Sequence, residues 1–282
     1  MRFDKKLIYK IRHLPLLRNL APFWIFANCV QMAFIKLFYA RGLKVIINGT
    51  DEIIVSPEYH KISTEYEPLV WKRLIEEVAE GDVVADVGAF IGLYAIALAK
   101  RVGVKGMVYA FEPDEKNLLV LKKHIRLNKI FNIKVINAVV GDAPGRVDFR
   151  ERSNQISCVN MPDSNDTGGR IKVVESKTLD EIFCESRVDI VKIDIEGYEG
   201  RTLLGAKKLL GRKNDYPRTI FIELHPWGWG YYGMTGGEIL SLLTNAGYKI
   251  ESIDSRPMEE VIKTYGEIVA YRQAITPCRR VR

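Results

Sequence analysis

Residues 83–92 read Val-Val-Ala-Asp-Val-Gly-Ala-Phe-Ile-Gly, and this stretch constrains the fold more than any other. A short apolar run that carries an acid and then meets a Gly-x-x-x-Gly spacing is typical of a buried strand that turns tightly into a helix. Gly88 permits backbone angles forbidden to other residues and lets a ligand approach the main chain. Gly92 lets the start of the helix pack closely on the sheet. The stretch therefore predicts a strand, a turn and a helix, with a binding site at the turn.

A second acid, Glu112, follows the apolar run of residues 107–111. At the end of the next strand of a strand-helix-strand unit, an acid is placed to accept hydrogen bonds from both hydroxyls of a ribose. The two acids, Asp86 and Glu112, therefore predict a ligand that carries a nucleoside.

A dinucleotide-dependent dehydrogenase is the obvious competitor, but its turn carries Gly-x-Gly-x-x-Gly. Here Asp86 precedes a Gly-x-x-x-Gly turn, which is the methyltransferase form, and we expect its carboxylate to face a ligand ammonium instead of a pyrophosphate. The expected cofactor is S-adenosylmethionine. The turn and strand-end residues expected to bind it are Asp86, Gly88, Ala89, Gly92 and Glu112. A strand-helix turn that binds no ligand is the alternative.

The net charge of +7 is concentrated at the N-terminus. Residues 1–45 contain nine Lys/Arg and one acid, a net charge of +8, so the remainder of the chain is close to neutral at −1. A near-neutral domain argues against a broad nucleic-acid-binding face, and no nucleic acid is expected as a partner. We therefore expect any anionic partner to bind at the basic N-terminus.

Residues 20–40 are apolar and aromatic, with basic residues on both sides. Their length is near that of a membrane span, but polar interruptions make a weak one. An interfacial helix on an anionic membrane surface and a helix packed on the catalytic domain are the two stronger interpretations. No signal peptide is evident. The four cysteines form no Cys-x-x-Cys pair, which fits a reducing cytoplasm and indicates neither a zinc site nor a disulfide framework.

Further along, strands and helices alternate. We expect a hairpin at Asn48-Gly49, a helix after Pro68, a helix at 114–127 that ends at a left-handed Asn128, and a strand pair around residues 142–145. Residues 151–170 predict a mobile loop over the site. Strands at 188–195 and 219–224 follow. This alternation gives a mostly parallel sheet with helices on both faces and ligands at the carboxyl ends of its strands.

Several motifs occur in an order that resembles the FkbM family of S-adenosylmethionine-dependent methyltransferases. They are Asp86-Val87-Gly88-Ala89 with Gly92 and Tyr94, Phe111-Glu112-Pro113, Thr178-Leu179-Asp180, the run from Val191 to Glu199, and Ile222-Glu223. The resemblance covers about residues 65 to 250. It departs from the family at Phe90, where Asn is usual, and at Ala95, where Thr or Ser is common.

The resemblance implies an α/β fold with a Rossmann-like class I methyltransferase sheet, seven-stranded with its last strand antiparallel. It also implies O-methylation of a hydroxyl on a sugar, a glycolipid or a related metabolite. The expected organisation is an N-terminal helical extension at 1–45, a methyltransferase domain at 46–275 and a basic tail at 276–282.

Ionisable residues after the later strands are the candidates for chemistry. Lys192, Asp194, Glu196 and Glu199 form the densest cluster, and polar side chains at a buried strand end are costly unless used. His225 lies at a strand end on the ligand side, as general base, substrate hydrogen-bond partner or structural residue. His13, His60 and His124 are expected to face solvent.

Three further acids have open roles. Glu67 resembles an acid that the family often has before its first helix, with a solvated charge as the alternative. Asp142 could reach the adenine amino group, but a turn residue is the simpler interpretation. Asp194 and Glu223 could hold a divalent cation, yet the sequence fixes no geometry, so no metal site is assigned.

Two other functions compete with sugar or lipid O-methylation. A nucleic-acid methyltransferase is disfavoured because the chain has no Pro-Pro, and its Pro277-Cys278 lies in the tail. A non-catalytic, membrane-recruited binding module that kept the fold is the alternative from a different class.

Overall fold

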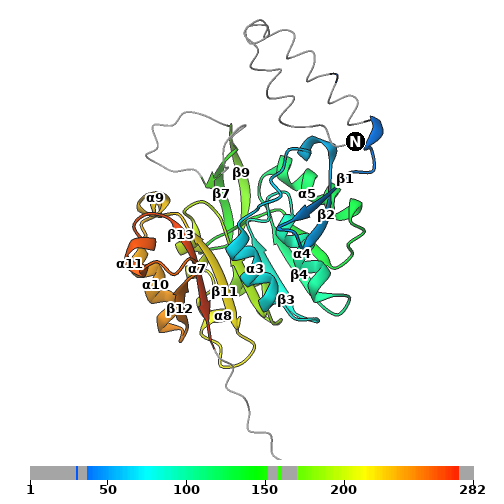
Figure 1. The fold of residues 1–282 in the computed structure, drawn as a ribbon. Coiled ribbons are helices and arrows are strands. Elements are labelled where there is room, and N and C mark those ends of the chain that lie inside the picture. The colour runs from blue at the N-terminus through cyan, green and yellow to red at the C-terminus, as the bar shows by residue number, and fades with distance from the viewer. Residues whose placement is uncertain (1–29, 31–36, 152–157, 160–169, 273–282) are drawn as a thin grey trace, which may run out of the picture.

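The computed structural model describes residue 30 and residues 37–151, 158–159 and 170–272. Its centre is a seven-stranded sheet in the order β12-β13-β11-β10-β3-β4-β5 (Figure 1). The strands are β3 (Val83–Val87), β4 (Met107–Phe111), β5 (Ile133–Ile136), β10 (Ile190–Ile193), β11 (Thr219–Leu224), β12 (Lys249–Ser252) and β13 (Gly266–Tyr271). Only β13 runs antiparallel to both of its neighbours, β11 and β12, within this sheet. The predicted fold class, with the last strand antiparallel, is confirmed.

Side chains alternate between two apolar layers because successive residues of a strand point to opposite faces. Val84 of β3 belongs to one layer and Ala85 to the other. The first layer is covered by α3 (Pro68–Glu77), α4 (Leu93–Val102) and α5 (Glu115–Leu127). The second is covered by α6 (Leu179–Ile182), α7 (Glu199–Leu204), α8 (Lys207–Leu210) and α10 (Gly236–Asn245).

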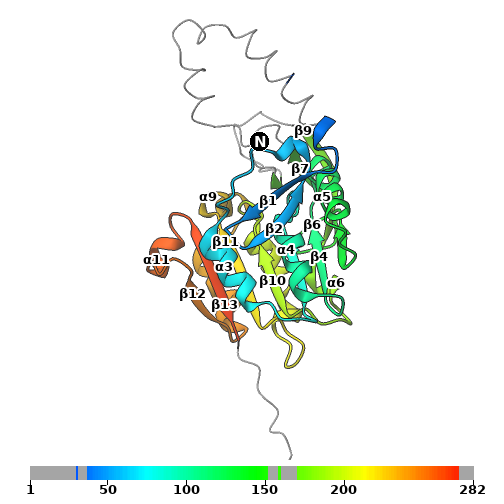
Figure 2. The same ribbon diagram turned by 45° about the vertical axis from the view of Figure 1, so that its right-hand side comes forward.

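A hairpin of β1 (Leu43–Ile47) and β2 (Asp51–Val55) lies beside α4 and α5 (Figure 2). Asn48 and Gly49 both have positive φ, 48° and 74°, as the predicted Asn-Gly turn requires. Strand β1 straddles the domain boundary expected at residue 45. The hairpin leads through η1 (Pro57–Tyr59) to α3.

A second sheet, in the order β6-β9-β7-β8, was not predicted. It consists of β6 (Val139–Val140), β7 (Gly145–Glu151), β8 (Cys158–Val159) and β9 (Arg170–Lys177). The strand pair expected around residues 142–145 is wrong, because β9 lies between β6 and β7 and pairs with both. Of the expected loop at 151–170, Cys158 and Val159 pair with β7. The prediction that this loop is mobile falls mainly on residues outside the described ranges.

Smaller differences concern helix ends. Asn128 is right-handed, with φ of −86°, and the left-handed residue is Lys129, with φ of 55°. The side chain of Asn128 instead hydrogen bonds both backbone groups of Ile54 in β2. Three short helices, α9 (Pro226–Trp229), η2 (Gly230–Tyr232) and α11 (Met258–Val261), were also not predicted.

Within the part of the chain that the structure describes, no helix combines the length and the apolar character needed to cross a membrane. The expectations for residues 1–29, for most of 30–40 and for the tail at 276–282 lie outside the described residues.

Candidate functional site

A cavity of about 820 Å³ opens where the central strands end, a volume typical of small-molecule sites. Its floor comes from four neighbouring strand ends: Gly88 after β3, Glu112 after β4, Asp194 after β10 and Glu223 in β11. Because these strands lie in the order β11-β10-β3-β4, the four residues are arranged along one edge of the sheet. We call the part near β3 and β4 the cofactor half, and the part near β10 and β11 the acceptor half.

Two glycines shape the turn after β3. Gly88 has φ of 89°, and a Cβ there would lie 1.8 Å from the carbonyl oxygen of Asp194. Gly92 has φ of 88°, and its Cβ would meet Leu121 Cδ1 at 2.3 Å. Glycine is therefore required by contacts within the protein, to bring β3 against β10 and α4 against α5. Gly88 lines the cavity, whereas Gly92 and the buried Ala89 are not among its lining residues.

Phe90 adopts a left-handed conformation in this turn, with φ of 48°. Asn tolerates that conformation better than other residues, which accounts for the Asn usual in the resembling family. The Phe90 side chain is 47% exposed and lines the cavity. Its backbone N–H donates to Glu112 Oε2 at 2.8 Å, so the turn holds the acid of the next strand in place.

Glu112 is buried but faces the cavity. Besides the bond from Phe90, its Oε1 accepts from the backbone N–H of Asp114 at 2.9 Å and from Asn117 Nδ2 at 3.4 Å. A carboxylate offers about four acceptor sites, so these contacts fix its orientation and leave capacity for a ligand hydroxyl. Burial raises the pKa of Glu112 to about 8, although these donors act against the shift.

Asp86 is fully buried and is not among the residues that line the cavity. Neither of its carboxylate oxygens has a hydrogen-bond partner among the described residues. It lies in register with Lys192 of the adjacent strand. Burial raises the pKa of Asp86 to about 6, and Lys192 opposes that shift. The carboxylate is therefore not exposed to the cavity in this arrangement, and its contact with a ligand ammonium stays a prediction.

Lys192 is also buried, and its Nζ lies 3.0 Å from Asp194 Oδ2 and 4.6 Å from the centroid of the Tyr94 ring. Burial would lower the pKa of this amine, but Asp194, Asp86 and Glu67 raise it above its ordinary value. A permanently charged Lys192 cannot accept a proton. It compensates the charge of the carboxylates around it.

Glu67 and Asp142, two of the acids with open roles, lie in different places relative to the cavity. Glu67 lines the cavity, where its Oε2 accepts from Tyr94 Oη at 2.8 Å. It caps the start of α3 in a left-handed conformation. Asp142 is not a lining residue and instead forms an ion pair of 2.7 Å with Arg201. The structure thus brings Glu67, but not Asp142, to the site.

Beside Glu67, the acceptor half carries the carboxylates of Asp194, Glu196 and Glu223. Glu196 has φ of 57°, a strained conformation for a non-glycine residue, and such strain is common at functional sites. Burial raises the pKa of Glu196 to about 7, against the effect of His225. For Glu223, burial acts upward, but the nearby His225 ring and the hydrogen bond from Tyr265 lower its pKa to about 2.

His225 is 4% exposed, and its ring is held by the buried carboxylate of Glu199. Its Nδ1 lies 2.7 Å from Glu199 Oε1, and Trp229 Nε1 donates to the other oxygen of Glu199 at 2.8 Å. Burial would lower the pKa of His225, but Glu199 and Glu223 raise it to about 11. These carboxylates favour the protonated ring when no ion or ligand is bound, and the predicted role of His225 as general base stays a prediction.

The remaining histidines are not simply solvent-facing. His124 is completely buried, and the prediction for it is wrong. Its Nε2 accepts from the backbone N–H of Ser56 at 2.9 Å, and its Nδ1 lies 2.9 Å from the carbonyl of Ile91. It therefore ties the hairpin to the turn after β3. His60 is half-buried, and His13 lies outside the described residues.

The apolar wall of the cavity was not predicted from the sequence. Val139, Val140, Phe149 and Val159 come from the second sheet, and Tyr198 packs with them. The alternation of Val147 and Phe149 with charged residues was the available signal, since it is the pattern of a half-buried strand. The wall suits the flat, apolar faces of a nucleobase.

A family model, the methyltransferase FkbM domain, matches residues 86–250. No curated protein matches the chain. Among solved structures, a methyltransferase FkbM from Methylobacillus flagellatus is 18% identical to this chain, with a TM-score of 0.48. The match covers 76% of this chain and 49% of the Methylobacillus chain. The chain thus spans about half the length of that protein.

Two further solved structures are similar to the chain at lower sequence identity. A SAM-dependent methyltransferase from Aquifex aeolicus is 17% identical, and the match covers 73% of this chain and 89% of the Aquifex chain at a TM-score of 0.40. A putative methyltransferase from Streptococcus mutans, in complex with SAH, is 11% identical, and the match covers 75% of this chain and 100% of the Streptococcus chain at a TM-score of 0.45.

Proposed function

Since the chain belongs to the FkbM family of methyltransferases, we propose that it methylates a hydroxyl oxygen of a sugar, a glycolipid or a related metabolite. S-adenosylmethionine is the cofactor that this membership implies, and it supplies an electrophilic methyl carbon when bound. One observation carries the proposal: a single cavity joins a nucleoside-type half at β3 and β4 to a carboxylate-rich half at β10 and β11.

The residues of the cofactor half fit the cofactor. Glu112 is held rigidly by Phe90 and Asp114 and has acceptor capacity for ribose hydroxyls. The apolar wall from the second sheet suits the adenine. The unpartnered oxygens of Asp86 lie in the strand that leads into the turn and are costly to leave unsatisfied. A water molecule between these oxygens and a ligand ammonium would relieve that cost.

The acceptor half suits a polar acceptor with several hydroxyls. Carboxylates accept hydrogen bonds from hydroxyls, and an acceptor positioned in line with the methyl carbon needs little more than a proton acceptor. In the reaction the O–H proton passes to a carboxylate, Glu196 or Glu223. The oxygen bonds to the methyl carbon as the carbon–sulfur bond breaks, and the electron pair stays on sulfur.

Glu112→Ala tests the cofactor half. Ribose hydroxyls lose charge-assisted partners, so the affinity for S-adenosylmethionine in calorimetry should fall by about 1 to 3 kcal/mol. Glu115→Ala is the matched control, because Glu115 lies three residues away with an exposed side chain and does not line the cavity. Unchanged affinity in a folded Glu112→Ala protein would refute the cofactor pose.

A panel of glycans, glycolipids and polyhydroxylated metabolites, incubated with methyl-labelled cofactor, tests the acceptor class. Glu196→Gln and Glu223→Gln should each retain cofactor affinity, while the variant that lacks the proton acceptor should lose about 100-fold or more in rate. Label transferred only to nucleic acid, or to no acceptor despite cofactor binding, would favour the competing functions instead.

We also propose that residues 1–45 recruit a cytoplasmic enzyme to an anionic membrane surface where a lipid-linked acceptor is found. The net charge of +8 supports this, since basic residues near an anionic leaflet are worth about 1 kcal/mol each. The full chain should sediment with anionic vesicles and be partly released by salt, whereas a chain starting near Lys44 should stay in solution. A full chain that ignores vesicles would refute recruitment.

A further inference from the structure

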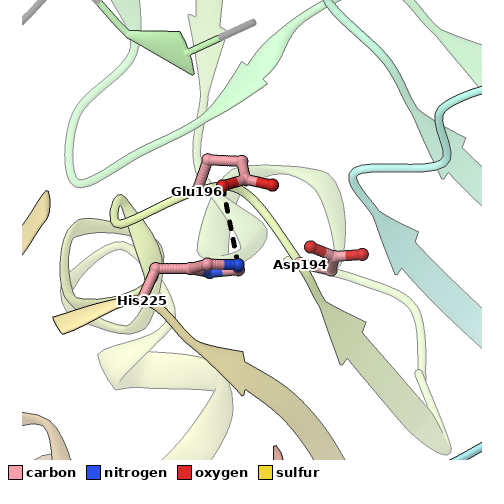
Figure 3. Close-up of side chains that lie close together, drawn as sticks. All are labelled: Asp194, Glu196 and His225. Carbon is pink, nitrogen blue, oxygen red and sulfur yellow. Dashed lines mark ion pairs between the residues drawn. The ribbon is translucent and has the colours of Figure 1, made fainter. Parts of the chain in front are cut away.

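Three potential metal ligands converge at the acceptor half of the cavity (Figure 3). They are Asp194 after β10, Glu196 in the turn that follows, and His225 after β11. One ligand atom from each lies within 4.8 Å of the others. Figure 3 shows the Glu196 carboxylate and the His225 ring facing each other, with Asp194 beside them.

The orientation of His225 is an observation independent of the carboxylates. The ring is 4% exposed, and the buried Glu199 engages Nδ1 at 2.7 Å, which leaves Nε2 directed at the cluster. A histidine that binds a metal almost always donates its other ring N–H to a carboxylate or carbonyl in this way. Glu199 is fixed in turn by Trp229 and by the backbone N–H of Gly197 at 2.8 Å.

The distances around Nε2 suit a shared ion better than direct hydrogen bonds. Nε2 lies 3.6 Å from Glu196 Oε2 and 3.6 Å from Glu223 Oε1, beyond the usual length of an N–H···O bond. Ligand atoms lie about 2.0 to 2.3 Å from a first-row divalent cation, so two ligands of one ion are separated by roughly 3 to 4.5 Å.

The charge of the region also favours a cation. Four carboxylates gather around the ring, Asp194, Glu196, Glu199 and Glu223. In the described part of the chain, the ion pairs that reach this group come from Lys192 and His225. A bound divalent ion would compensate the excess negative charge of a buried site, where an uncompensated carboxylate is costly.

We propose that Asp194, Glu196 and Nε2 of His225 bind one first-row divalent cation, with Glu199 as the residue that orients the histidine. Two carboxylates with an imidazole suit Mn²⁺, with Zn²⁺ next, and suit Mg²⁺ or Ca²⁺ less well because these prefer oxygen ligands alone. The inference rests on the proposed function for its role. A cation held by these residues would make the proton of a nearby acceptor hydroxyl easier to remove. With Glu196 occupied as a ligand, Glu223 would be the carboxylate that takes the proton.

The test measures metal binding without substrate. The full chain, stripped with EDTA and dialysed, is titrated with Mn²⁺ while free Mn²⁺ is followed by electron paramagnetic resonance. One site per chain is expected, and Zn²⁺ should displace the ion. Asp194→Asn, Glu196→Gln and His225→Gln should each abolish the site, and Glu199→Gln should weaken it about 10- to 100-fold, as supporting residues of metal ligands do.

Glu67→Gln is the matched control. Glu67 belongs to a second possible group, with Asp194 and Glu223, so its variant should keep Mn²⁺ affinity if the proposed ligands are correct. Thermal melts verify that each variant is folded. No Mn²⁺ or Zn²⁺ bound by the native chain, or equal binding by a folded His225→Gln protein, would overturn the proposal, and loss of the site in Glu67→Gln would overturn the ligand set.

Failure of the metal site and failure of the proposed function give different results. A protein that methylates its acceptor equally well with EDTA refutes the ion and leaves the methyl transfer standing. A protein that binds Mn²⁺ through these residues but methylates no hydroxyl refutes the proposed acceptor and leaves the metal site standing.

Discussion

Gly88→Ala should separate the effect of backbone strain from the effect of a steric clash. The new Cβ would lie 1.8 Å from the carbonyl oxygen of Asp194, and such atoms essentially never approach within 3.0 Å. The ends of β3 and β10 would therefore have to move apart by about 1.2 Å. A left-handed conformation costs an L-residue about 1 to 2 kcal/mol, and overpacking adds about 1 to 3 kcal/mol. The expected loss in the free energy of unfolding is about 2 to 5 kcal/mol.

Gly49→Ala is the control for this substitution. Gly49 also has positive φ, 74°, but a Cβ at this position would meet nothing within 4 Å, so only the conformational cost of about 1 to 2 kcal/mol applies. Urea unfolding followed by circular dichroism gives both values, and calorimetry gives the affinity for S-adenosylmethionine. Affinity should fall only in Gly88→Ala, because the displaced turn carries the donor to Glu112. Equal losses of stability in the two variants would refute the argument from close contact.

Lys192→Met should lower the free energy of unfolding by about 3 to 5 kcal/mol because it leaves buried carboxylates uncompensated. Lys105→Met, which removes an exposed ion pair, should change it by less than about 1 kcal/mol in the same urea titration. Affinity for S-adenosylmethionine should rise between pH 6.5 and 8 and then level off. Burial raises the pKa of Glu112 to about 8, and ribose hydroxyls prefer its ionised form, so calorimetry at pH 7 should detect proton release that Glu112→Gln abolishes. His124→Leu should cost about 2 kcal/mol or more in urea unfolding, because the N–H of Ser56 and the carbonyl of Ile91 each lose a partner.

The central sheet could be predicted because its signals are local. The apolar run of residues 83–87, the glycines of the turn and the acid at 112 each indicate one step of a strand-helix-strand unit. The second sheet offers a local signal for strand β7 but none for how its strands pair. Strand β6 has two residues, and it pairs with β9 more than 30 positions later, so neither strand has a neighbour in sequence that indicates its pairing. The apolar wall of the cavity was missed for the same reason.

Contacts across strands could not be predicted within the site for a different reason. Asp86 and Lys192 lie 106 positions apart in sequence, but parallel pairing of β3 with β10 places them in register. The charge of the buried Asp86 is compensated by Lys192 on the neighbouring strand, and neither segment alone indicates this pairing. His124 was misjudged similarly, because its partners Ser56 and Ile91 lie in other elements.

The environment of His225 could not be predicted from its sequence neighbours. Its place after a strand indicated the ligand side, but its chemistry depends on Glu199, whose position 26 residues earlier says nothing about contact. Without that carboxylate, neither the tautomer nor the orientation of the ring would be fixed. With it, Nε2 is directed toward Asp194, Glu196 and Glu223. The buried acid that engages Nδ1 is therefore the residue that would orient Nε2 toward a metal ion, and Glu199→Gln should weaken Mn²⁺ binding while the three ligands remain in place.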